Sequence, residues 1–138
     1  MAQVIIMRGI PGSGKSTRAR ELVEAHSGTA TIRSTDNQFM IDGKYVFNPR
    51  LLGINHARNL ELFESDIVEG IDLVIVDNTN IKKRDYAKYI EFALLHGYSV
   101  REEVVGHFDL SFVEACAKRN THGVPYDAIL RMAQNFED

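Results

Sequence analysis

The chain has 138 residues, of which 44% are hydrophobic and 25% charged, and its formal net charge is −3. This length suits a single domain over 1–138, and the acidic balance argues against a broad basic surface that coats nucleic acid, while a local basic groove stays compatible with it. The one cysteine excludes an internal disulfide, the apolar runs are too short to span a membrane, and the N-terminus lacks a signal-peptide pattern. We therefore expect a cytoplasmic protein.

Strand and helix patterns alternate along the chain. In chain order we expect a strand at 3–8, a helix at 15–26, a strand at 29–34, a helix at 48–70, a strand at 72–77, a helix that ends at 97, an edge strand at 98–106, and helices at 111–120 and 126–136. Such alternation predicts a three-layer α/β domain with a parallel sheet, whose ligands bind at the carboxyl ends of the strands. The chemistry is therefore expected at 9–17, 34–38, 77–80 and 106–109.

Local patterns predict where helices begin and which faces they bury. Asn48 followed by Pro49 is a helix start, and "SFVE" over 111–114 has the form of a capping box. In the helix that ends at 97, the apolar side is expected to consist of Tyr86, Tyr89, Ile90, Ala93 and Leu94.

The stretch "GIPGSGKST" over 9–17 matches the pattern GxxxxGK[ST] in full and lies between a buried strand and a helix. Small residues let backbone N–H groups turn inward around phosphates, and the following helix presents its positive end to them. Lys15 adds a charge on the β- and γ-phosphate oxygens, and the Ser16 hydroxyl is a Mg²⁺ ligand. We therefore expect ATP and Mg²⁺ as cofactors, bound by a loop that consists of Gly9, Pro11, Gly12, Ser13, Gly14, Lys15, Ser16 and Thr17.

Two aspartates follow strands at the same expected edge of the sheet. Asp77 ends the apolar run at 73–76, a place that suits an aspartate holding Mg²⁺, with a turn residue as the alternative. Asp36 follows the strand at 29–34, where a carboxylate can accept the proton of an attacking hydroxyl, with an N-cap of a short helix as the alternative. The pattern favours the functional role for both.

Six stretches together resemble a known family. They are "GIPGSGKST", "STDNQF", "DGKYVFNP", "VIVDNTN", "KRNTHGVP" and "ILRM". In this order and spacing, over essentially the whole chain, they are similar to P-loop kinase domains related to phage polynucleotide 5′-hydroxyl kinase, among the zeta-toxin and AAA-like P-loop kinases. The resemblance implies a four- to five-stranded, mostly parallel sheet with the phosphate-loop strand central, and a short helical lid at about 116–126. It also implies transfer of the γ-phosphate to the 5′-hydroxyl of a polynucleotide.

The resemblance also implies roles by position. Lys15 and Ser16 are the phosphate and Mg²⁺ residues, Asp36 is the general base, and Arg119 is a lid arginine that contacts ATP and stabilises charge on the transferring phosphoryl group. Two departures stand out. The metal aspartate is one position earlier than in the phage enzyme, at Asp77. The arginine that should follow the base by three residues is replaced by Phe39, so acceptor binding differs or another cation substitutes, such as Arg33, Lys44, Arg50 or Arg58.

The leading hypothesis is a kinase whose partner is the 5′ end of RNA or DNA. A small-molecule kinase for a nucleoside, antibiotic or sugar hydroxyl is the alternative enzyme, and a regulatory module that binds nucleotide is an alternative of another class. The segment "KYVFNP" at 44–49 either stacks unpaired bases or is an ordinary packed loop. His56 and His122 are isolated histidines, for which packing or surface positions are expected.

Overall fold

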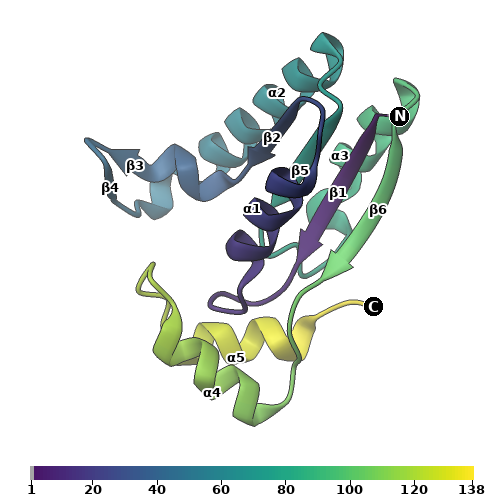
Figure 1. The fold of residues 1–138 in the computed structure, drawn as a ribbon. Coiled ribbons are helices and arrows are strands. Elements are labelled where there is room, and N and C mark those ends of the chain that lie inside the picture. The colour runs from purple at the N-terminus through teal and green to yellow at the C-terminus, as the bar shows by residue number, and fades with distance from the viewer. Residues whose placement is uncertain (1) are drawn as a thin grey trace.

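The computed structural model describes residues 2–138 (Figure 1). Its main sheet has four strands in the order β2-β5-β1-β6, and every neighbouring pair is parallel. The strands are β1 (Gln3–Arg8), β2 (Ala30–Arg33), β5 (Leu73–Asp77) and β6 (Ser99–Val104). The strand that leads into the phosphate loop is therefore an inner strand and β6 lies at an edge, which confirms the expected α/β class.

Within the described part of the chain, five α-helices accompany the sheet. They are α1 (Lys15–Ala25), α2 (Leu52–Glu69), α3 (Lys83–Leu95), α4 (Leu110–Arg119) and α5 (Tyr126–Asn135). Two short 3₁₀ helices, η1 (Thr35–Phe39) and η2 (Pro49–Leu51), flank a hairpin made of β3 (Met40–Ile41) and β4 (Lys44–Tyr45). Within residues 2–138, no helix combines the length and apolar character that crossing a membrane requires.

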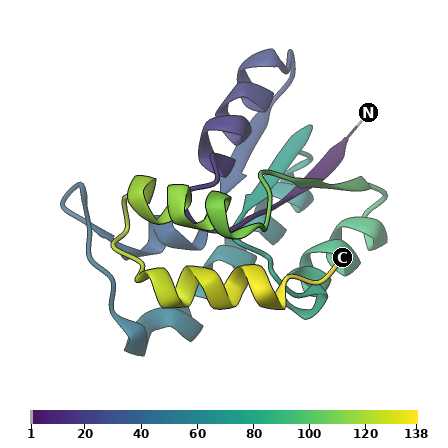
Figure 2. The same cartoon turned by 90° about the horizontal axis from the view of Figure 1, so that it is seen from below.

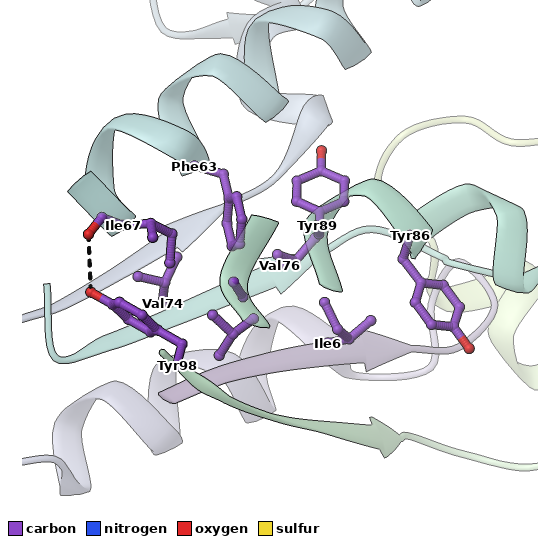
Figure 3. Close-up of a cluster of buried hydrophobic side chains, with 10 residues drawn as sticks. Ile6, Phe63, Ile67, Val74, Val76, Tyr86, Tyr89 and Tyr98 are labelled. Carbon is purple, nitrogen blue, oxygen red and sulfur yellow. Dashed lines mark hydrogen bonds between the residues drawn. The ribbon is translucent and has the colours of Figure 1, made fainter. Parts of the chain in front are cut away.

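The two faces of the sheet are covered by different helices. Successive side chains of a strand point to opposite faces, so β1 presents Ile5 to one side and Ile6 to the other. Ile5 packs in a cluster with Ala19 of α1, while Ile6 packs with Phe63 of α2 and Tyr89 of α3. Figure 3 shows the second of these clusters, where aromatic rings from the two helices lie over the strand side chains. This sandwich gives the three layers predicted from the sequence.

The last two helices lie across the carboxyl ends of the strands rather than beside the sheet (Figures 1 and 2). They pack in a third apolar cluster, in which Val113 and Cys116 of α4 and Ile129 of α5 contact Ile10 of the phosphate loop and Ile81. Burial of these side chains fixes α4 directly beside the loop. The stretch expected to act as a lid, at about 116–126, covers the end of α4 and the segment that leads to α5, and its role as a lid stays a prediction.

Three local expectations need correction. The helix at 111–120 begins earlier, because Asp109 is its N-cap and accepts a hydrogen bond from Phe112 N, so "SFVE" forms no capping box. Leu94 is 59% exposed, since one step beyond Ala93 turns it about 100° away from the buried stripe. The β3–β4 hairpin was not expected, although Asp42-Gly43, both with positive φ, carries the turn signal for it.

Arg8 joins the end of β1 to the C-terminal segment. Its guanidinium is 2% exposed and donates to the carbonyls of Asn80, Ile81 and Glu137. It also lies 3.2 Å from a carboxylate oxygen of Glu102. A buried cation with this many partners holds three separate segments of the chain together.

We expect Arg8→Met to lower the free energy of unfolding by about 3 kcal/mol, because it leaves three carbonyl groups without their donor. Urea unfolding followed by circular dichroism measures this loss. The control is Arg131→Met at an exposed position of α5, for which a change below about 0.5 kcal/mol is expected. Equal effects of the two substitutions would contradict a structural role for the Arg8 network.

Candidate active site

The phosphate loop is a tight turn between β1 and α1. Gly12 and Gly14 have φ values of 82° and 100°, a region that glycine adopts without strain. Ser13 N donates to the carbonyl of Ile10 at 3.1 Å, which closes the turn. Among residues 2–138, no side chain caps the first amides of α1 and its first turn holds no acidic residue. These N–H groups and the helix dipole are available to an anion, as expected of a phosphate site.

Ser16 and Asp77 meet at the end of the sheet. Ser16 Oγ donates to Asp77 Oδ2 at 2.8 Å, although the residues are 61 positions apart. Asp77 is buried, and its Oδ1 has no hydrogen-bond partner among residues 2–138. Mg²⁺ prefers oxygen ligands, and in nucleotide sites it takes one or two from the protein and the rest from phosphates and water. The Ser16 and Asp77 side chains fit that cation, because the unsatisfied Oδ1 atom of Asp77 is a further oxygen ligand for it.

No group of three or more His, Cys, Asp and Glu side chains forms a metal site within residues 2–138. Within the same residues Lys15 forms no ion pair, so its ammonium group is available to a phosphate.

A pocket of about 580 Å³ opens beside the phosphate loop. Its lining consists of loop residues 12–14, Thr17, Arg18 and Glu21 of α1, residues 103–104 at the end of β6, residues 105–106 directly after that strand, and Arg119. Arg18 Nε lies 2.6 Å from a Glu103 carboxylate oxygen. That hydrogen bond is the main reason why the pKa of Glu103 lies below its usual value. The volume is within the range of small-ligand sites, and its place beside the loop suits the nucleoside part of a nucleotide.

Arg119, at the end of α4, reaches the phosphate loop. Its Nε and Nη2 atoms donate to the carbonyl oxygen of Gly12 at 3.2 and 3.0 Å. The close approach of α4 to the loop explains this contact, because an added Cβ at Gly12 would lie 2.4 Å from the Cys116 carbonyl oxygen. The structure therefore brings Arg119 beside the loop, and its role in stabilising phosphoryl charge stays a prediction.

Asp36 lies in η1, one strand away from Asp77. Its side chain is 49% exposed and does not cap the helix, since the N-cap position is Ser34. The segment is anchored to the end of β5, because Thr35 N donates to Asn78 Oδ1 at 2.8 Å. Asp36 thus lies at the carboxyl edge of the sheet, where a general base was expected, and Asn78 connects it to the Mg²⁺ side of the site.

Two neighbours of Asp36 were not identified from the sequence. Tyr45 of the hairpin donates to Asp36 Oδ1 at 3.5 Å, and His122 Nδ1 lies 3.3 Å from Asp36 Oδ2. Burial, followed by the charge of Asp36, raises the pKa of Tyr45 to about 12. His122 was expected only to pack or face solvent. The one sequence signal for its role is its position inside the lid stretch "KRNTHGVP".

The structure also bears on which basic side chain is free to take the place of the arginine that Phe39 replaces. Phe39, which replaces the arginine of the phage enzyme, is buried against the rings of Tyr45 and Phe47 and does not face solvent. Arg33 is held by Asp66 through two hydrogen bonds of 2.6 and 2.7 Å. Lys44, Arg50 and Arg58 are exposed around the hairpin and the start of α2. His56 of α2 lies with its Nδ1 atom 3.1 Å from Thr35 Oγ1 of η1.

Comparisons with known proteins agree with this geometry. A family model described as "AAA domain" matches residues 4–138. The chain is similar to NEDD4-binding protein 2 of Homo sapiens, with 33% identity over 134 residues, which are 97% of this chain and 8% of that protein. The chain therefore spans only a small part of that relative's length.

Solved structures share the fold. One is a chain of the Pnkp1/Rnl/Hen1 RNA repair complex, with a TM-score of 0.70 and 21% identity, covering 98% of this chain and 44% of that one. Another is a gluconokinase from Sinorhizobium meliloti 1021, with a TM-score of 0.65 and 18% identity, covering 99% and 75%. These likenesses establish a P-loop kinase-like fold, and they do not choose between acceptors.

Gly12→Ala tests the contact between the loop and α4. The new methyl group meets the Cys116 carbonyl and the residue must keep φ near 82°, so we expect a loss of about 2 kcal/mol in stability and weaker nucleotide binding. Calorimetric titration with a non-hydrolysable ATP analogue measures the binding. Gly53→Ala, where the added Cβ meets nothing within 4 Å, serves as the control and should leave binding unchanged. Parental affinity in Gly12→Ala would show that α4 does not constrain the loop.

Proposed function

The chain belongs to the AAA domain family, and from this premise we propose that it is an ATP- and Mg²⁺-dependent kinase that phosphorylates the 5′-hydroxyl end of a polynucleotide. Its P-loop kinase-like fold supports phosphoryl transfer in general. The acceptor is argued below from the surface around Asp36.

Each part of the site has a role in this proposal. The phosphate loop and Lys15 hold the β- and γ-phosphates, Ser16 and Asp77 hold the cation, and Arg119 faces the transferring group from the lid side. Bound Mg²⁺ neutralises charge on the phosphate oxygens. Asp36 accepts the proton of the attacking hydroxyl as that oxygen bonds to the γ-phosphorus, while the bond from this phosphorus to the β–γ bridging oxygen breaks and ADP leaves. Transfer of this kind depends on positioning and electrostatics more than on covalent chemistry.

The observation that carries the polynucleotide assignment is the open, aromatic surface beside the base. Asp36 is half exposed, and beside it Tyr45 of the hairpin and Phe47 after it pack on the buried ring of Phe39. Phe47 is 51% exposed, so one ring face is available to a stacked base. Lys44 and Arg50 are exposed on the same segment and can contact phosphates of the strand. A strand can use the Phe47 ring and these two cations together, whereas a small acceptor has no neighbouring bases and phosphates to place on them.

Transfer of labelled γ-phosphate tests the proposal. We expect label on 5′-hydroxyl oligonucleotides of RNA or DNA, and none on the same oligonucleotides already carrying a 5′-phosphate or on gluconate. Label on the small alcohol alone would favour a small-molecule kinase. ATP binding without any labelled acceptor would favour a regulatory nucleotide-binding module. Either result would overturn the polynucleotide assignment.

Asp36→Asn separates the base from the binding functions. The substitution keeps the shape of the side chain and removes the proton acceptor, so we expect transfer to a 5′-hydroxyl to fall by about 10²- to 10⁴-fold with ATP affinity little changed. The control is Asn37→Ala, on the exposed side of η1. Loss of ATP binding in Asp36→Asn would make Asp36 a metal or structural residue instead.

A further inference from the structure

One short segment reaches both halves of the site. Arg119 closes α4 and donates to Gly12 O in the phosphate loop, whereas His122, three residues later, lies 3.3 Å from Asp36. The phosphate loop and Asp36 belong to different connections of the sheet. Residues 119–122 therefore bridge the part of the site that holds the nucleotide and the part that faces the acceptor.

His122 is held by a second contact as well. Its ring lies on the ring of Tyr45, with centroids 4.1 Å apart and planes inclined by 32°. Tyr45 in turn donates to the other oxygen of Asp36. The carboxylate thus has one neighbour from the hairpin and one from the lid, and these two neighbours stack on each other. Asp36 keeps half of its side-chain surface for a substrate.

The lid has a defined conformation that presents His122. Asn120 Oδ1 accepts from Val124 N at 3.0 Å, and its Nδ2 atom donates to the carbonyls of Ala117 and Val124. Gly123 adopts a φ of 69°, which lets the chain turn within this clamp. The side chain of residue 122 is therefore directed by the turn.

We infer that His122 is a positioning residue that ties closure of the lid over the nucleotide to the placement of the general base. The inference rests on the proposed role of Asp36. In the closed arrangement His122 fixes one oxygen of Asp36 and docks on Tyr45, while Arg119 engages the phosphate loop. Breaking the contacts of His122 should then weaken nucleotide binding, although His122 makes no contact with the phosphate loop, because the two contacts of the lid support each other.

The contact itself is tested without any acceptor. A histidine ring on a tyrosine face has ring-proton resonances displaced upfield, and His122 is assigned by comparison with His122→Ala in proton NMR spectra of the full chain. We expect Tyr45→Leu to abolish the displacement. A His122 signal at the position of an exposed histidine, unmoved by Tyr45→Leu, would overturn the inference.

The coupling is tested by calorimetric titration with a non-hydrolysable ATP analogue in the presence of Mg²⁺. We expect His122→Ala to weaken binding about fivefold or more, and Thr121→Ala, at the exposed neighbouring position, to bind like the parent. Matched thermal unfolding of the two variants shows that both are folded. Parental affinity in His122→Ala would overturn the tie between the lid and the base.

The effect on the base is read from transfer to a 5′-hydroxyl oligonucleotide. His122→Phe keeps the stack on Tyr45 and loses the polar contact with Asp36, so we expect kcat to fall about tenfold with the KM for ATP less affected. An unchanged kcat would overturn the positioning role. If the parent phosphorylates no oligonucleotide, the proposed function fails, while the NMR and titration results still decide whether His122 couples the lid to Asp36.

Discussion

The hydrogen bond between Ser16 and Asp77 marks the place that we propose for the cation. It exists because β1 and β5 are parallel neighbours in register, with Met7 beside Asp77, so the loop after β1 passes the end of β5. A different strand order would separate Asp77 from Ser16 and from the loop that can hold the phosphates. The apolar residues that fill both faces of these strands therefore position the site as well as stabilise the fold.

The second constraint is the seating of α4 and α5 across the end of the sheet. Ile10, within the phosphate loop, is buried in the same cluster as Val113, Cys116 and Ile129. The loop consequently packs against α4, and Gly12 allows its closest approach to that helix. The turn after α4 extends from this cluster to Tyr45 of the β3–β4 hairpin and to Asp36 of η1. The phosphate loop is thus packed against buried apolar residues, whereas Asp36 is half exposed.

The sequence predicts the parts of this site that arise from local pattern. The phosphate loop needs only a run of nine residues, Asp77 ends an apolar strand, and Asp36 follows closely after a second strand. The contacts of His122 with Asp36 and Tyr45 are different, because they join residues 86 and 77 positions apart and leave no periodic trace in the sequence. Two smaller errors of sequence-based prediction concern Leu94 and the start of α4. A shift of one residue moves a side chain off the buried face of a helix, and it likewise changes which residue caps the helix.

A single site at the carboxyl edge of the sheet is tested most directly by paramagnetic broadening. Mn²⁺ in place of Mg²⁺, bound with a non-hydrolysable ATP analogue, broadens the NMR signals of nearby amides. We predict strong broadening at residues 12–17 and 77–79, weaker broadening at 34–36, and sharp signals at Gly70 and Gly97 near the opposite edge, with the pattern weakened by Asp77→Asn. Broadening centred elsewhere, or a pattern that Asp77→Asn leaves unchanged, would contradict the assignment of Ser16 and Asp77 as the cation site.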